Sequence, residues 1–174
     1  DVYMDTTECT YTSQSLKDLV KPYCILNGEH DLEYAITYKG ESVSDIVNAG
    51  DYTITITSEI ENVSFNTTTF NFKVKPYEIT INYSNDTYEY DGEIKSLTAT
   101  AVGVFAGDIV NIVLTNNTAK DIGSYIVTAE IDNENYVISS ECASHNLVIN
   151  KHVDILLEST RATYSREDLI NNIK

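Results

Sequence analysis

Polar and apolar residues alternate along much of this chain, which is the pattern of strands with one buried face. Over residues 78–83 and 52–58, isoleucine and tyrosine alternate with polar residues, mostly threonine. Side chains two apart in a strand share a face, so the apolar ones are expected to point inward and the hydroxyls toward water. Similar segments are residues 23–26, 33–38, 70–75, 87–90, 97–102, 109–114, 125–131 and 145–149. The sequence therefore predicts an all-β protein, with residues 15–20 and 165–172 as candidate short helices.

The chain also repeats itself. Residues 121–127 have the pattern of residues 48–54, 73 positions earlier. Thr-Tyr pairs at Thr10-Tyr11, Thr87-Tyr88 and Thr163-Tyr164 mark three starts, 77 and 76 residues apart. A period of this length is too long for a solenoid unit and suits a small self-contained β domain. About seven short strands per repeat, with frequent turn residues between them, predict a β-sandwich.

Two complete repeats fit into the chain. We expect residues 1–8 to be the end of a preceding segment, 9–76 to be the first repeat, 77–152 the second, and 153–174 the start of a third repeat or a linker. One predicted strand passes into the next across Pro76, which fixes its own φ and favours an extended residue before it. The expected fold is all-β, with two tandem immunoglobulin-like β-sandwich domains end to end plus the start of a third repeat.

Each repeat has the spacing of a tyrosine corner, Asp/Asn-x-Gly-x-Tyr. The motif occurs at Asp121, Gly123 and Tyr125, and again at Asn48, Gly50 and Tyr52. In immunoglobulin-type sandwiches such a Tyr donates a hydrogen bond back to the loop before it. We therefore expect the Tyr52 hydroxyl to reach the backbone near residues 46–50, and the Tyr125 hydroxyl to reach residues 119–123.

The second repeat resembles a known family. The resemblance rests on Tyr88-x-Tyr90-Asp91-Gly92, residues 97–100, Ala106-Gly107-Asp108, the tyrosine corner, Asn135-Tyr136, and residues 147–149 before Lys151. These motifs are similar to the MBG or YDG-type repeats, which occur in tandem in large bacterial surface proteins and adhesins. The first repeat departs at Val63, where the second has Tyr136, and at Ser13-Gln14, which replace the Asp-Gly turn. The resemblance implies an extracellular or cell-surface stalk, with neighbouring repeats or copies of the same protein as partners.

The charge of the chain excludes several partners. Its net charge is −16, with only 11 Lys and Arg among 174 residues. Nucleic acids and anionic membrane surfaces require basic patches, which so few dispersed cations do not form. No stretch approaches the roughly 20 apolar residues that insert into a membrane. Residues 1–5 also lack the basic start and apolar run of a signal peptide.

The sequence predicts no enzyme and no tightly bound cofactor. Carboxylate pairs lie in polar turns that are expected to be solvated, whereas acid–base catalysis requires carboxylates in a cleft. Calcium is the strongest metal candidate, because Asp132, Glu134 and Asp86 lie in oxygen-rich turns near a predicted domain boundary. Calcium takes six to eight oxygen ligands, and the EF-hand pattern is absent. The competing interpretation is that these segments are ordinary solvated turns.

Five Asn-x-Ser/Thr sequons are present. They lie at Asn62, Asn66, Asn82, Asn85 and Asn116. They are candidate glycosylation sites if the protein passes through a secretory route that adds N-glycans, and ordinary turn residues otherwise.

Three cysteines leave three arrangements open. All three are unpaired thiols, or Cys9 pairs with Cys24, or Cys24 pairs with Cys142 across the junction of the repeats. The last arrangement follows if Cys24 opens a strand at the junction and Cys142 faces it from the other side. It requires the two Cα atoms to come within about 7 Å of each other.

Two classes of function remain. The first is a non-enzymatic structural rod or spacer in an extracellular surface protein, adhesin stalk or filament. The alternative is an adhesive module whose loop end binds a glycan or a host surface protein. Exposed aromatic platforms are not evident, because Trp is absent and Tyr23, Tyr52 and Tyr83 fit core or corner positions.

Overall fold

Strands dominate the chain, as the alternating pattern predicts. The computed structural model describes residues 1–155, which contain seventeen strands and one short 3₁₀ helix, η1 (Lys17–Leu19). This helix lies inside the candidate segment 15–20, whereas the candidate segment 165–172 lies outside the described residues. The all-β prediction is confirmed.

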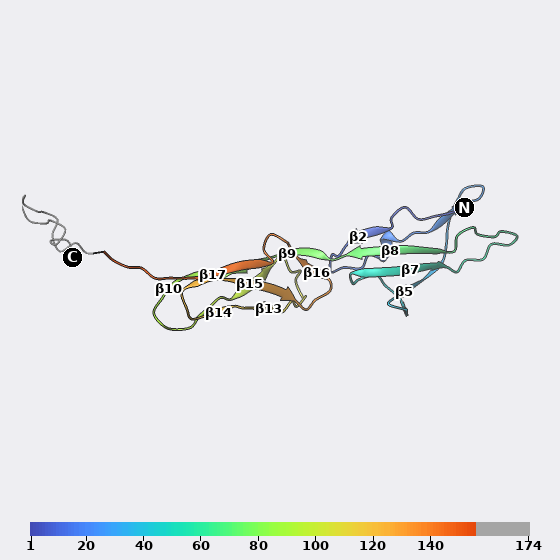
Figure 1. Ribbon diagram of the computed structural model, residues 1–174. Coiled ribbons are helices and arrows are strands. Elements are labelled where there is room, and N and C mark those ends of the chain that lie inside the picture. The colour runs from blue at the N-terminus through green and yellow to red at the C-terminus, as the bar shows by residue number, and fades with distance from the viewer. Residues whose placement is uncertain (156–174) are drawn as a thin grey trace, which may run out of the picture.

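The strands form two groups that follow each other along one long axis (Figure 1). The first group uses residues 2–75 and the second uses residues 77–150, and we call these repeat one and repeat two. Each sheet belongs to one group only. The last strand of repeat one ends at Lys75 and the first strand of repeat two begins at Tyr77, so Pro76 is the whole connection.

Repeat one packs a five-stranded sheet against a small three-stranded one. The larger sheet has the order β2 (Glu8–Thr10), β8 (Thr69–Lys75), β7 (Gly50–Ile56), β5 (Tyr34–Tyr38) and β6 (Glu41–Val43). The smaller has the order β1 (Val2–Tyr3), β3 (Tyr23–Ile25) and β4 (Glu29–Asp31). Strand β2 runs parallel to β8, and the other pairs are antiparallel. The inward residues Ile54, Phe72 and Val74 are fully buried.

Repeat two has the same plan with different edges. Its larger sheet has the order β10 (Thr87–Glu89), β17 (Ser144–Asn150), β15 (Gly123–Ile131) and β13 (Ile112–Thr115). The second sheet has the order β12 (Ala99–Val102), β9 (Tyr77–Tyr83) and β16 (Tyr136–Ile138), and a short pair joins β11 (Lys95–Ser96) to β14 (Thr118–Ala119). Strand β10 runs parallel to β17, as β2 does to β8. Leu97, Val127 and Leu147 form the buried centre.

The ladders correct the alignment of the two repeats. The Tyr11 amide donates to the Lys75 carbonyl at 2.9 Å, and the Tyr90 amide donates to the Asn150 carbonyl at 2.7 Å. Tyr11 therefore corresponds to Tyr90, and its predicted match with Tyr88 is wrong by two residues. A Thr-Tyr pair recurs easily in alternating strands, whereas register is set by the hydrogen bonds to the last strand of each repeat.

The boundary expected at residue 8 is also wrong. Val2 is buried, and β1 pairs with β3 so that Val2 lies opposite Cys24. Residues 1–8 thus contribute to repeat one. The sequence missed β1 because a strand of two or three residues is too short to show alternation, and it missed β2, β4, β6, β11, β14 and β16 for the same reason. Residues 153–155 contain no strand, and the rest of the proposed third repeat lies outside the described residues.

Candidate functional site: the junction between the repeats

The two repeats share one apolar core. Tyr11 of repeat one and Ile79 and Tyr136 of repeat two are buried in the same cluster as Ile54 and Phe72. The rings of Tyr11 and Tyr136 meet edge to face, with centroids 5.5 Å apart. Such contacts add to the stabilisation from burial alone. The junction is therefore built as an interior and not as a solvated hinge.

Phe105 extends this aromatic contact on the side of repeat two. Its ring centroid lies 5.9 Å from that of Tyr11 and 4.6 Å from that of Tyr77, the first residue after Pro76. The Phe105 amide donates to the Tyr136 hydroxyl at 3.0 Å. The loop before β13 is thus fixed against both the connection and the neighbouring repeat.

Asp108 joins the two repeats through hydrogen bonds. The Tyr11 hydroxyl donates to Asp108 Oδ2 at 2.7 Å, and the Tyr136 hydroxyl donates to the same oxygen. The hydrogen bonds from Tyr136 and Tyr11 lower the pKa of the Asp108 carboxyl. Burial and the hydrogen bond to Asp108 raise the pKa of Tyr136 to about 12. Hydrogen bonds to a charged group are roughly twice as strong as neutral ones, so a carboxylate between two phenols is a firm contact.

A second set of contacts lies at Asn135. Its Oδ1 accepts from the Ala49 amide at 2.7 Å, and its Nδ2 donates to Asn48 Oδ1 at 3.1 Å. Its own carbonyl accepts from the Tyr77 amide at 2.9 Å. One residue of repeat two thereby holds both the corner loop of repeat one and the strand that follows Pro76.

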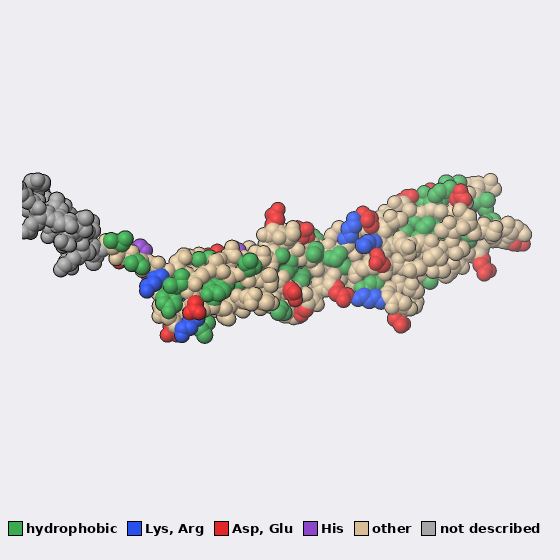
Figure 2. Space-filling model, viewed as in Figure 1, with side chains coloured by type: hydrophobic (Ala, Val, Ile, Leu, Met, Phe, Trp, Pro, Cys, Tyr) green, Lys and Arg blue, Asp and Glu red, His purple; other side chains and the backbone are tan. Residues whose placement is uncertain are grey.

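An ion pair closes the outer rim of the junction. Lys39 Nζ lies 2.6 Å from Glu134 Oε2, and the two side chains are 60% and 78% exposed. Figure 2 shows Lys and acidic side chains gathered near the middle of the long molecule, on the face in view. Exposed pairs of this kind contribute little to stability, so the buried ring of Tyr11 and the partly buried hydrogen bond of Asn135 to Ala49 matter more.

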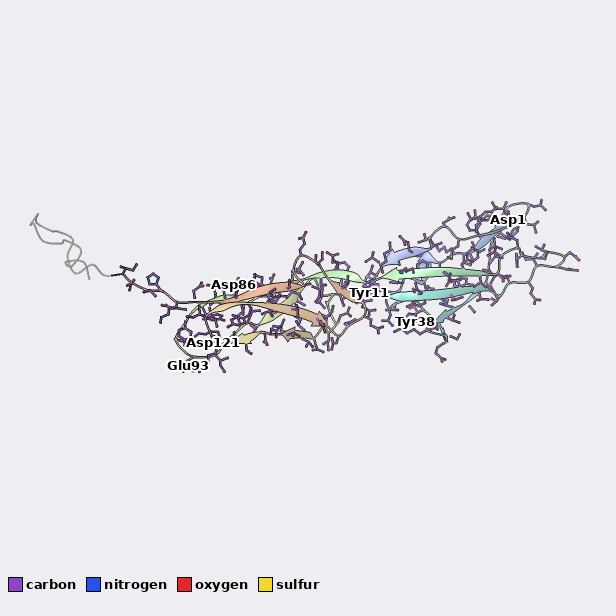
Figure 3. All side chains as sticks on the ribbon, in the orientation of Figure 1. Asp1, Tyr11, Tyr38, Asp86, Glu93 and Asp121 are labelled. Atoms are coloured by element: carbon purple, nitrogen blue, oxygen red, sulfur yellow. The ribbon has the colours of Figure 1, made fainter. Side chains whose placement is uncertain are left out.

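The tyrosine corners are present in both repeats. The Tyr52 hydroxyl donates to the Asn48 carbonyl at 2.9 Å, and the Tyr125 hydroxyl donates to the Asp121 carbonyl at 3.0 Å. Both acceptors lie within the ranges expected from the sequence. In repeat one the corner positions Asn48 for its contact with Asn135. In repeat two the corner lies at the far end from Tyr11, as the label of Asp121 shows in Figure 3.

Gly50 gives the corner of repeat one its shape. Its φ of 137° is one that residues with a Cβ rarely adopt, and a Cβ there would lie 2.7 Å from Tyr38 Cε2. Tyr38 stacks on Tyr52 with centroids 4.6 Å apart and donates its hydroxyl to the Ala49 carbonyl at 2.8 Å. The ring of Tyr38 fits against the corner because residue 50 has no side chain.

A groove of about 440 Å³ runs beside the junction. Its lining includes Tyr38, Asn48, Asn111, Asp132 and Asn133. Many of their polar atoms already bond to one another; for example, Asn111 Nδ2 donates to Asp132 Oδ2 at 2.7 Å. The groove is thus a polar recess whose side chains mainly support the turns around it.

The three calcium candidates do not come together. Asp132 accepts from Asn111, and Glu134 pairs with Lys39 at the junction. Asp86 lies away from the junction (Figure 3), where its Oδ2 is 2.7 Å from His145 Nε2. Within residues 1–155, no group of three or more His, Cys, Asp or Glu side chains is placed to hold a metal ion. Calcium binding stays a prediction without an assembled ligand set.

The five sequon asparagines are all exposed, at Asn62, Asn66, Asn82, Asn85 and Asn116. Two of them occupy left-handed turn positions, with φ of 63° at Asn62 and 61° at Asn116. Access for a modifying enzyme is therefore available at each of them, and glycosylation stays a prediction.

Of the three cysteine arrangements that the sequence leaves open, the Cys24–Cys142 bridge is wrong. All three cysteines lie in the described part of the chain, and all three are free thiols. Cys24 is buried with Val2, Leu32 and Ile56, in a cluster separate from the shared core, and Cys9 packs against that shared core. Cys142 lies beside β9, where its Sγ accepts from the Ile81 amide at 3.2 Å. The prediction failed because β3 pairs with β1 and β4 in the N-terminal sheet and does not open at the junction.

The comparisons with known proteins were informative for repeat two. Residues 79–153, which include nearly all of repeat two, match the family model described as MBG domain. The match contains Phe105, Asp108, Asn135 and Tyr136, so repeat two contributes its side of the junction from within the matched region. No curated protein and no solved structure gives a significant match to the chain.

Sequence reasoning missed the role of the junction residues. Asp108, Asn135 and Tyr136 were recognised only as parts of family-like motifs. The available signal was their position, because all three lie in loops or at a strand end of repeat two and none is required by strand alternation. Tyr11 carried no signal of its own, since its partner is 97 residues away.

No helix among the described residues is long and apolar enough to cross a membrane.

Proposed function

We propose that this chain is a non-enzymatic, stiff spacer segment of an extracellular surface protein, such as an adhesin stalk or a filament. The observation that carries the proposal is the contact of Tyr11 and Tyr136 with one carboxylate, Asp108, inside a core shared by both repeats. Domains within a chain normally move relative to each other unless their interface is large and apolar. A spacer requires the opposite, a fixed angle between successive units.

Three features of the junction support stiffness. The connection is one residue, Pro76, whose ring restricts φ. The rings of Tyr11 and Tyr136 meet across the junction, and the hydrogen bonds of Asn135 hold the corner loop at Asn48 and Ala49. Rotation about Pro76 would break both sets and expose Tyr11. The match of repeat two to the MBG domain supports the extracellular setting, because MBG-type repeats are typical of surface proteins.

Small-angle scattering with matched variants tests the proposal. Asp108→Ala removes the acceptor of both phenols, whereas Asp121→Ala removes a carboxylate at the far end of repeat two with the same change in net charge. We expect the wild type and Asp121→Ala to give the same narrow distribution of long intramolecular distances. Asp108→Ala should broaden that distribution and shorten its mean. A compact wild-type particle with the repeats side by side would reject the proposal.

An adhesive role is the second candidate, and the groove beside the junction favours it. Carboxamide and carboxylate side chains next to a tyrosine ring are groups that bind sugar hydroxyls, and Asn48, Asn111 and Tyr38 line this groove. A glycan array and a pull-down with host surface proteins test this function. Binding that is lost in Asn111→Ala, with unchanged scattering, would support adhesion in addition to the spacer role.

A further inference from the structure

Repeat two has an open sheet edge that repeat one covers. In repeat one, β5 lies between β7 and β6, and β6 forms the antiparallel ladder on its outer side. The equivalent strand of repeat two is β13, which pairs with β15. Within residues 1–155, no strand pairs with the other side of β13. Figure 1 places β13 at the border of repeat two, next to β15.

The ladder identifies the groups on this open edge. The Ala129 amide donates to the Ala143 carbonyl at 3.0 Å, so Ala129 is directed toward β17. Ala129 lies opposite Leu114, so these two residues do not bond to each other. The backbone groups of successive residues point to alternate sides of a strand, so Val113 and Thr115 exchange hydrogen bonds with β15. The amides and carbonyls of Ile112 and Leu114 therefore point away from the sheet. Neither residue has a backbone partner on that side among the described residues.

This edge lacks the usual protection against pairing. Natural edge strands carry charges, proline or a bulge. No charged residue and no proline occurs from Ile109 to Ala119, whereas the covering hairpin of repeat one carries Lys39 and Glu41. The Val113 side chain is 56% exposed on the outer face. A groove of about 560 Å³ lies along the start of the strand and includes Val104, Val110 and Ile112 in its lining.

We propose that β13 pairs with β13 of a second copy of this chain, antiparallel, about a twofold axis at Val113. Ile112 of each copy then lies opposite Leu114 of the other. Each such pair exchanges two N–H···O bonds, so the four free groups on each edge are all satisfied by the identical edge. The two Val113 side chains become direct cross-strand neighbours and bury each other.

A second copy fits this edge better than an unrelated peptide for two reasons. The strand is complementary to itself, since Ile112 and Leu114 present the same groups in reverse order after a twofold rotation. It also offers no charged side chain that would select a basic or acidic partner. β6 in repeat one shows that a strand of three residues is enough to cover the equivalent edge.

Charge limits the strength of this pairing. Each copy has a net charge of −16, and Glu130 lies directly opposite Val113 in the ladder with β15. Repulsion between exposed charges is screened by salt, with a Debye length of about 8 Å at physiological ionic strength. The dimer should therefore be weak in low salt and should strengthen as salt is added. Many copies side by side on a surface would add avidity.

Sedimentation velocity and amide exchange test the pairing. With the full chain, we expect reversible dimers whose population rises with protein concentration and with sodium chloride. In the same samples, the Ile112 and Leu114 amides should become protected from hydrogen exchange as the dimer forms. The amides of Val113 and Thr115 should be protected already in the monomer, because they bond to β15.

Two variants separate edge pairing from other association. Val113→Glu places two carboxylates at the axis, beside Glu130 of each copy, and should raise the dimer dissociation constant about tenfold or more. Ile126→Glu makes the same change in charge and is the matched control, since Ile126 is 64% exposed on the neighbouring strand β15. It should leave the dimer unchanged, and both variants should keep the wild-type thermal transition. A monomer at all salt concentrations, or a dimer that leaves the Ile112 and Leu114 amides unprotected, would overturn the proposal.

Discussion

The Tyr11 hydroxyl lies 2.7 Å from Oδ2 of Asp108, although 97 residues separate them in the chain. Tyr11 follows β2 in repeat one, and Asp108 follows the Gly107 turn in repeat two. This hydrogen bond joins the two repeats at a point where both also contribute to one apolar core. The angle between the repeats is thus set by the same side chains that complete each fold.

Replacing the corner tyrosines by phenylalanine should destabilise each repeat. Tyr52→Phe and Tyr125→Phe each remove a hydroxyl that donates to a backbone carbonyl. The loss should be about 0.5–1.5 kcal/mol, the net value of one hydrogen bond. Tyr52 is 2% exposed and should give the larger effect. Chemical denaturation measures it, with Tyr90→Phe as control. Unchanged midpoints for both corner variants would show that these hydrogen bonds contribute nothing net.

The two corner glycines should differ in their tolerance of alanine. Gly50 has a φ of 137°, and an added Cβ would lie 2.7 Å from the Tyr38 ring. The nearest atom to a Cβ at Gly123 is the Tyr125 hydroxyl, at 3.3 Å, and Gly123 needs no unusual φ. Gly50→Ala should therefore cost about 1–3 kcal/mol from backbone conformation alone. Gly123→Ala should cost less in the same thermal unfolding experiment. Equal losses would contradict this account.

Acid should weaken the junction through Asp108. The hydrogen bonds from Tyr136 and Tyr11 hold the pKa of Asp108 below its ordinary value of 3.8. A carboxyl with a lowered folded-state pKa contributes stability above its unfolded pKa, and this contribution is lost as the pH falls through the folded value. The stability difference between wild type and Asp108→Asn should thus be constant near neutral pH and shrink below about pH 4.

Urea unfolding at a series of pH values measures this difference. Other carboxyls with lowered pKa values, such as Asp86 and Asp132, are present in both proteins and contribute equally to both curves. A difference that stays the same down to pH 2 would show that folding does not lower the pKa of Asp108.

Alkylation should find three free thiols. In denaturant without reductant, mass spectrometry should show three modified cysteines per chain. In the native protein, Cys24 should react last, because it is 4% exposed and packs against Val2 and Leu32. Burial raises the pKa of the Cys9 thiol, which should slow its reaction relative to a fully exposed thiol. A crosslinked peptide pair containing Cys24 and Cys142 would contradict the structure.

Much of the fold could be predicted because its signals are local. The long strands β7, β8, β9, β15 and β17 appear in the sequence as alternation, and each was predicted nearly to its ends. The junction site could not be predicted in this way. Asn135 and Asp108 are polar loop residues, and loop composition does not reveal which distant loop lies opposite. The bonds from Asn135 to Asn48 and Ala49 cross 87 and 86 residues of chain.

The sequence by itself determined the all-β class, the repeated sandwich plan and the corners at Gly50-x-Tyr52 and Gly123-x-Tyr125. These features depend on periods of two residues and on single turn positions, so neighbouring residues are enough to specify them. Only the tertiary structure decided that Tyr11 corresponds to Tyr90, that Cys24 lies in the N-terminal cluster, and that β13 has an open edge. Register, edge pairing and domain contact depend on which surfaces meet after folding. Their energies come from partners far apart in the chain, which no local pattern records.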